Sequence, residues 1–179
     1  MAQFKAFAPQ VEVNGQTVLA VLNGMGPVQD LGQKILAQHG IKNPLPGLWY
    51  SQQAWLDAFR TIAETVGPMT LYSIGQAIPN SAQWPTQITT VEMALASIDT
   101  AYRINHRGGE IGSYQFNLVG PRSGKMICHN PYPSEFDQGI IYAVARKFAP
   151  LGSFPWIKLD ESAPTRKKGG DSCTFLIAW

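Results

Sequence analysis

Apolar residues in the front two thirds of the chain recur every three or four positions, the spacing of one helix face. Segments with this spacing start at residues 28, 51, 69 and 89. Gly40 ends the first as a left-handed cap, and Pro79 limits the third to residues 69–76. Thr89 and Glu92 form a capping-box pair for the longest predicted helix, which runs to Arg107. The pattern therefore predicts a helical front part.

A different pattern begins after residue 109, where apolar and polar residues alternate as they do in a half-exposed strand. Residues 110–119 and 125–129 flank a glycine-proline turn and predict a hairpin. A helix capped by Ser134 and Asp137 follows, and then two more strands, 156–159 and 174–179. Near the start of the chain the pattern leaves two alternatives open, because Asn14-Gly15 suits a hairpin turn and the residues after it suit a short helix.

These elements predict an α+β fold in which N-terminal helices pack on a four-stranded antiparallel sheet with one crossover helix. The chain has 179 residues, of which 45% are hydrophobic. A chain of this size buries roughly 70% of its unfolded surface in one core. We therefore expect one domain spanning residues 1–179, with a hollow between sheet and helices that forms a hydrophobic pocket.

Charge and cysteine content exclude several classes of protein. The net charge is +2, and only 15% of the residues are charged. No basic surface for nucleic acid or anionic membranes is indicated, and no apolar run approaches the ~20 residues of a membrane span. Two cysteines are too few for a disulfide scaffold, and Met-Ala-Gln-Phe-Lys does not start a signal peptide. We expect a cytoplasmic protein.

The run from Met126 to Gly139, followed by a helix, a strand and residues 165–175, resembles the end of the 4-vinyl reductase domain. That domain belongs to a fold group shared with heme-NO-binding sensor domains and with Golgi-transport tethering subunits. The resemblance implies a sensor or carrier that binds a small apolar or aromatic molecule as a homodimer. It also implies a separate signalling partner, because the sequence contains no output domain.

Members of that family with a metal site place cysteines and a carboxylate at positions that correspond here to Ser134, Glu161, Thr165 and Cys173. Hydroxyl groups are poor zinc ligands where thiolates are the norm, so we expect the zinc to be lost. Cys128 remains a weak metal candidate together with Cys173 and Glu161. The ordinary interpretation of such cysteines is that they are small core residues.

Heme is the weaker cofactor alternative. The related heme-NO-binding domains use one axial histidine and a Tyr-x-Ser-x-Arg signature that holds the propionates, and no such run occurs here. His39, His106 and His129 are the histidines available. We therefore expect no cofactor, and keep a heme-binding gas or redox sensor as an alternative function. The basic turn 166–168 is expected to be a solvated loop.

An enzyme acting on a hydrophobic or tetrapyrrole substrate through His106 and Glu110 is a second alternative, and a tethering protein is a third. No nucleophile elbow, phosphate loop or dinucleotide fingerprint supports catalysis. The preferred function is non-catalytic binding of an apolar or aromatic ligand. The predicted ligand-binding residues, chosen as inward-facing aromatic and polar groups, are Trp55, Phe59, Tyr72, Ile98, Tyr102, His106, Tyr114 and Phe116.

Overall fold

The computed structural model describes residues 3–179 and has the α+β architecture that the pattern predicts. Met1 and Ala2, the start of the segment expected not to be a signal peptide, lie outside the described residues. The helical elements are, in order, α1 (Gly15–Val18), α2 (Ala20–Met25), η1 (Gly26–Val28), α3 (Gln29–Gln38), α4 (Gln52–Thr65), α5 (Met69–Ser81), α6 (Val91–Ala96), α7 (Ile98–Ile104), α8 (Ser134–Phe148) and η2 (Arg166–Lys168).

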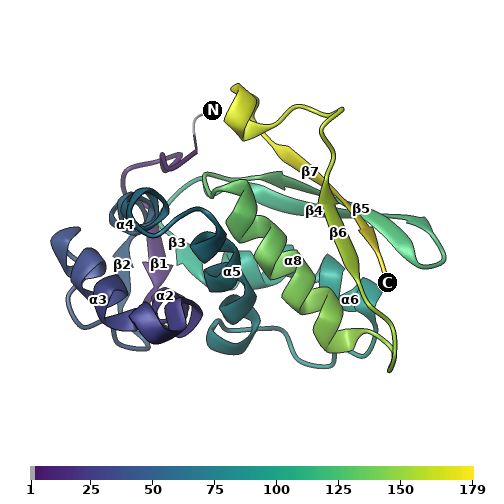
Figure 1. The fold of residues 1–179 in the computed structure, drawn as a ribbon, viewed down its shortest axis with the longest axis horizontal. Coiled ribbons are helices and arrows are strands. Elements are labelled where there is room, and N and C mark those ends of the chain that lie inside the picture. Colours follow the sequence, from purple (N-terminus) through teal and green to yellow (C-terminus); the bar gives the residue numbers. More distant parts are fainter. Residues whose placement is uncertain (1–2) are drawn as a thin grey trace.

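The structure has two antiparallel sheets, a small one in the left half of Figure 1 beside α4 and a larger one in the right half. The larger one has the strand order β4-β5-β7-β6, and α8 lies across it as the predicted crossover helix. The smaller sheet, β2-β1-β3, was not predicted. The strands are β1 (Glu12–Asn14), β2 (Trp49–Ser51), β3 (His106–Arg107), β4 (Ser113–Gly120), β5 (Ser123–His129), β6 (Trp156–Leu159) and β7 (Cys173–Ala178).

The sequence left open whether the residues after β1 form a hairpin or a short helix, and they form a helix. The Asn14 side chain accepts a hydrogen bond from the Gln16 backbone N–H at 2.9 Å and so caps α1. β1 pairs with β2 and β3 instead of forming a hairpin with the residues that follow it. The predicted helices at 28 and 51 are confirmed as α3 and α4, with Gly40 at φ +87° and the Ser51 hydroxyl as the α4 cap.

Three predicted helix boundaries are wrong. α5 continues through Pro79 to Ser81, because the helix is held between α2 and α8 and the proline sits in its last turn. The helix predicted from Thr89 to Arg107 is two helices, broken at Ser97, whose hydroxyl donates to the Ala94 carbonyl at 2.8 Å. Its cap is Thr90, and its last predicted residues form β3.

The helix predicted after the hairpin is confirmed as α8, but its predicted cap is not. Ser134 is the first helical residue, and no side chain caps the helix. Asp137 points into the core, where it meets Arg166. Arg166 is 3% exposed, so the prediction of a solvated basic turn is wrong at this residue.

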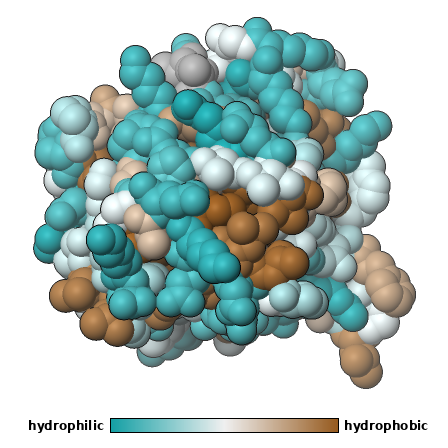
Figure 2. Space-filling view, turned by 60° about the vertical axis from the view of Figure 1, so that its left-hand side comes forward, coloured by the Kyte–Doolittle hydropathy of each residue, from teal (hydrophilic) through white to brown (hydrophobic). Residues whose placement is uncertain are grey.

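One continuous core cluster joins the helical half to the inner face of the large sheet. α5 is in close contact with α8 on one side and α2 on the other, and these three helices form the centre of the molecule (Figure 1). Apolar side chains also reach the surface, in a patch framed by polar residues on the face that Figure 2 shows. No helix among residues 3–179 is long and apolar enough to cross a membrane.

Candidate functional site

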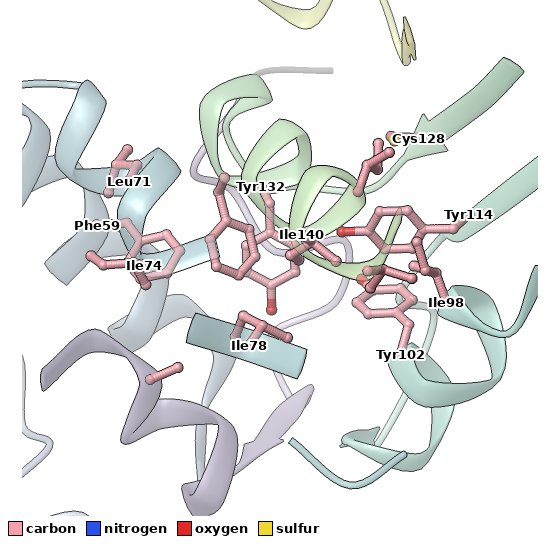
Figure 3. Packing of buried hydrophobic residues seen from close by; sticks show 14 of the residues in the cluster. Phe59, Leu71, Ile74, Ile78, Ile98, Tyr102, Tyr114, Cys128, Tyr132 and Ile140 are labelled. Carbon is pink, nitrogen blue, oxygen red and sulfur yellow. The ribbon is translucent and has the colours of Figure 1, made fainter. Parts of the chain in front are cut away.

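A small cavity of about 40 Å³ lies where α4, α5, α7 and α8 meet the inner face of β4. In Figure 3, Tyr102, Tyr114 and Ile98 lie on one side of Ile140, and Tyr132 and Ile78 lie on the other. The wall of this cavity is almost entirely apolar or aromatic. The lining residues are Thr17, Trp55, Ile78, Ala82, Trp84, Ile98, Ala101, Tyr102, Asn105, His106, Tyr114, Tyr132, Phe136 and Ile140.

His106 is the imidazole of this wall, and its two ring nitrogens have different partners. Nδ1 lies 2.8 Å from the Tyr102 backbone carbonyl, which can only accept, so Nδ1 carries the hydrogen. Nε2 therefore holds a lone pair and accepts from the Tyr132 hydroxyl at 2.6 Å. Gln52 donates to that hydroxyl at 3.0 Å. The result is a buried hydrogen-bond chain, from Gln52 through the Tyr132 hydroxyl, that ends on Nε2 of His106 as the acceptor.

Burial sets the charge of this imidazole. Burial lowers the pKa of His106 to about 4, against the raising effect of its bond to the Tyr102 carbonyl. The imidazole is therefore neutral at neutral pH, the form that coordinates metals. Burial raises the pKa of Tyr132 as well, so its phenol keeps its proton. A neutral, oriented imidazole is the chemical feature that this pocket offers.

A second polar network lies beside the pocket, at the first turn of α8. Arg166 forms an ion pair with Asp137 and donates to the Asn130 side-chain oxygen at 2.9 Å. The Tyr114 hydroxyl donates to the Asp137 carboxylate at 2.6 Å, which connects the network to the pocket wall. Burial raises the pKa of Asp137, while Arg166, Tyr114 and Asn130 lower it.

Three buried polar atoms near the pocket have no hydrogen-bond partner. They are the indole nitrogens of Trp55 and Trp84 and the Oε1 atom of Gln52. An unsatisfied buried donor costs about 1–3 kcal/mol, so such groups call for an explanation. Both tryptophans line the cavity. The wall therefore has hydrogen-bonding capacity that the protein itself does not use.

The structure brings five of the eight predicted ligand-binding residues to one cavity. These are Trp55, Ile98, Tyr102, His106 and Tyr114. The other three lie elsewhere: Phe59 is packed in the core against Trp55, Tyr72 faces Tyr142 across α5 and α8, and Phe116 is half-buried beside Trp179.

The residues of the predicted catalytic pair are not brought together in the cavity. Glu110 is exposed, and its carboxylate accepts from the Gly112 backbone N–H at 2.8 Å. His106 is 8% exposed and has both ring nitrogens engaged. The metal candidates Cys128 and Cys173 are opposite each other in register on β5 and β7, and both are buried. Within the described part of the chain, no group of three metal-ligating side chains occurs.

Sequence reasoning missed the residue that contacts His106. Tyr132 lies in the loop before α8, where periodicity carries no signal. A usable signal was present, because Tyr132-Pro133-Ser134 matches the first two positions of the Tyr-x-Ser-x-Arg signature. Phe136 occupies the place of the signature's arginine and lines the cavity instead.

A scan against protein-family models finds no match, and neither does a search among curated proteins. Solved structures do match over nearly the whole chain. An H-NOX protein from S. oneidensis in the Fe(II) state has a TM-score of 0.69 at 12% identity, covering 92% of this chain and 95% of its own. The unliganded Fe(II) H-NOX protein from K. algicida has a TM-score of 0.59 at 15% identity, with coverages of 92% and 95%.

An oxygen-binding H-NOX domain related to soluble guanylate cyclases matches with a TM-score of 0.63 at 12% identity, covering 92% of this chain and 91% of that one. These likenesses show that the chain has the H-NOX α+β fold. They support the heme-NO-binding side of the predicted fold group, whereas the resemblance to the 4-vinyl reductase branch stays a prediction.

The comparisons correct the expectation that the pocket works without a cofactor. Two of the solved structures that share this fold are described as Fe(II) H-NOX proteins, and a third concerns heme redox potential and porphyrin distortion. Heme was set aside because no Tyr-x-Ser-x-Arg run occurs in the sequence, and the fold shared with these heme and Fe(II) structures overturns that expectation.

Proposed function

We propose that this chain is a non-catalytic sensor domain whose pocket takes a heme, with His106 as the axial ligand of the iron. The observation that carries the proposal is the state of His106 in the cavity wall: it is neutral, its ring is fixed through Nδ1, and its Nε2 lone pair accepts from the Tyr132 hydroxyl, which a metal would have to displace. When bound, a heme supplies an iron with an open position for a small gas. The chain's own part is to hold, orient and enclose that group.

The donor chemistry of the wall fits a heme. The imidazole is a standard axial donor, and its Nδ1–H bond to a carbonyl is the kind of outer contact that orients such ligands. Aromatic and aliphatic side chains form the rest of the wall, as a porphyrin face requires. Trp55 and Trp84 contribute unpaired N–H groups that could bond polar edges of a guest.

Two features of the structure oppose easy binding. The cavity of about 40 Å³ is close to the size of one water, whereas pockets for drug-sized ligands measure roughly 300–1,000 Å³. Phe136 replaces the signature arginine, and no described Lys or Arg lines the cavity to pair with propionates. Heme entry thus requires Tyr132 to leave Nε2 and the wall to open, and we expect weak binding.

Absorbance after reconstitution with hemin tests the proposal. Purified protein should gain a Soret band at one heme per chain. His106→Gly should lose it and recover it when free imidazole is added, because imidazole can replace the missing side chain. His106→Gln, which keeps a side chain of similar size, should also lose the band without losing the fold, as judged by circular dichroism.

His129→Gln is the matched control, since His129 lies on β5 with its ring beside Phe7, outside the cavity wall. This variant should keep the Soret band unchanged. A spectrum that is identical in the wild type and in both His106 variants would refute the assignment of the axial ligand.

The volume favours a second candidate, a smaller aromatic ligand of phenol size, held by the same wall without iron. Here the hydroxyls of Tyr102 and Tyr132 and the imidazole would contact the polar end of the ligand. Native mass spectrometry of protein purified without added hemin separates the two candidates by the mass that co-purifies. Hemin titration without a Soret band, combined with thermal stabilisation by phenol, would favour the smaller ligand.

A homodimer and a separate signalling partner belong to this proposal, as the family resemblance implies. Sensing requires that the ligand bind one arrangement of the helices or of the dimer more tightly than another. Sedimentation equilibrium with and without hemin tests the dimer. A chain that stays monomeric in both states would remove the dimer from the proposal and leave the pocket assignment intact.

A further inference from the structure

The molecule has an apolar end that the pocket does not use. The loop between α8 and β6 and the tip of the β4–β5 hairpin both project at the right of Figure 1, at the same end of the large sheet. Large apolar side chains are exposed on both segments. They are Leu118, Val119, Leu151, Phe154 and Trp156, and we call this group the apolar end.

The strand register places the two segments close together. Trp156 is opposite Ala178, which is opposite Ser123, which is opposite Gly120, so one row of residues crosses the whole sheet. Neighbouring strands are about 4.8 Å apart, so the row spans roughly 14 Å. The exposed residues of both segments therefore lie at one rim.

The loop holds its apolar residues outward by a defined turn. Ser153 donates its backbone N–H to the Pro150 carbonyl at 3.0 Å, and Gly152 has φ +82°, the conformation that a type II turn requires. Leu151 takes the first central position of this turn and is 107% exposed, and Phe154 is 81% exposed. Arg146 stiffens the loop by donating to the Ser153 carbonyl at 3.0 Å.

Cations outnumber acidic residues around this end. Residues 113–129 contain two cations, Arg122 and Lys125, and residues 138–159 contain three, Arg146, Lys147 and Lys158; neither range contains an aspartate or glutamate. Lys125 makes a long ion pair with Asp160 at 4.0 Å. Glu92, on α6, is the acidic residue of a helix that contacts both α8 and β4. These five cations outnumber the two acidic residues, Asp160 and Glu92, so the balance is positive here although the whole chain has a net charge of only +2.

We propose that the apolar end docks this protein on an anionic phospholipid surface, with Leu151 and Phe154 entering the lipid and the surrounding cations facing the headgroups. Protruding apolar residues with a basic border are what interfacial binding uses, and tryptophan favours the headgroup level. A symmetric contact with a second copy would bring like charges together, which is unfavourable. This inference is independent of what occupies the pocket.

Vesicle co-sedimentation of the full chain tests the proposal. Wild-type protein should bind mixed vesicles that contain equal amounts of phosphatidylcholine and phosphatidylglycerol. It should bind vesicles of phosphatidylcholine alone only weakly. The double variant Leu151→Ser/Phe154→Ser should lower the partition coefficient at least about tenfold, because two inserted side chains are lost. Lys147→Glu/Lys158→Glu should lower it by a similar factor, and added salt should weaken wild-type binding.

Matched controls change the same residue types elsewhere. Met69→Ser removes an exposed apolar side chain at the start of α5, and Lys34→Glu/Lys42→Glu reverses two charges at the opposite end of the molecule. Both should bind the mixed vesicles as the wild type does. All substituted side chains of the apolar end are exposed, so circular dichroism should be unchanged.

Three results would overturn the proposal. The first is wild-type protein that fails to bind either vesicle, and the second is a Leu151→Ser/Phe154→Ser variant that binds as tightly as the wild type. The third is a vesicle-free dimer, seen by sedimentation velocity, that this double variant dissociates, since the apolar end would then be covered by a second copy.

Discussion

The buried carboxylate of Asp137 holds three segments of the chain together. It accepts hydrogen bonds from Tyr114 and Asn130 and neutralises Arg166, which also donates to the Cys128 carbonyl at 2.8 Å. Because Arg166 is 3% exposed, its charge has no access to water. The pair fixes the loop after β5 against the start of α8, and that loop carries Tyr132.

Removing the carboxylate should therefore be costly. Asp137→Ala leaves a buried guanidinium unpaired, and we expect the free energy of unfolding to fall by about 3–5 kcal/mol. Glu12→Gln, which breaks the exposed pair between Glu12 and Arg107, should cost less than about 1 kcal/mol. Urea denaturation of both variants measures the difference. Equal costs would mean that the buried pair contributes no more than a surface one.

The depressed pKa of His106 predicts a pH dependence of stability in the heme-free protein. A free histidine has a pKa of about 6.5, whereas that of His106 is about 4. Between these values the unfolded chain binds a proton that the folded chain does not. The free energy of unfolding should therefore fall as the pH is lowered from about 6.5 to 4, by up to about 3 kcal/mol, and be unaffected by this group above that range.

Urea denaturation at several pH values, with His106→Gln beside the wild type, measures this effect. The raised pKa of Asp137 acts in the opposite direction, because the folded state then holds its proton more tightly, but it is present in both proteins and cancels in the comparison. A His106→Gln variant with the same slope as the wild type would contradict the assignment.

At the scale of elements, the contact between α5 and α8 depends on two glycines. A Cβ atom added to Gly139 would come closer than 3.0 Å to the Tyr72 carbonyl oxygen, and one added to Gly75 would meet the Phe136 carbonyl in the same way. The two backbones are therefore nearly in contact. Since α8 carries Phe136 and Ile140 and α5 carries Ile78, this contact sets the width of the cavity.

We expect Gly139→Ala to force the helices apart and to lower the free energy of unfolding by about 1–3 kcal/mol, or more if the backbones cannot shift. Thermal unfolding measures the loss. Ser73→Ala, on a partly exposed face of α5, is the control and should change stability by less than about 0.5 kcal/mol. A Gly139→Ala protein as stable as the control would show that the two helices are free to separate.

At the scale of the whole molecule, one continuous core cluster includes residues of both sheets and of α5 and α8. The prediction of a single domain over residues 1–179 then has a direct test. Calorimetry should give one transition whose calorimetric and van't Hoff enthalpies agree, and fluorescence and circular dichroism should report the same midpoint. Two separated transitions would divide the chain into independently folding parts.

The expected location in the cytoplasm stays a prediction. The finding that bears on it is that no described helix could span a bilayer. Peripheral binding through the apolar end is a different matter, since it needs only a few protruding side chains.

Local sequence patterns determined the elements whose signals are local. Helical spacing located α3, α4 and α8, and strand alternation located the β4–β5 hairpin, because these features depend on neighbours a few residues away. The order of these elements was enough to predict the four-stranded sheet and its crossover helix. Helical spacing also placed Trp55 and Tyr102, which are buried, on inward faces, whereas His106 lies on β3 and not on the helix that was predicted to contain it.

Only the tertiary structure decided what depends on residues far apart in the sequence. The burial of Arg166 against Asp137 and the bond from Tyr132 to His106 each join segments that local spacing treats separately. The tertiary structure also brings cations and apolar side chains together at one rim. The net charge of the sequence could not predict this, because it does not say where each charge lies. Side-chain periodicity sets which face of an element points inward, whereas packing between elements sets which inward faces meet.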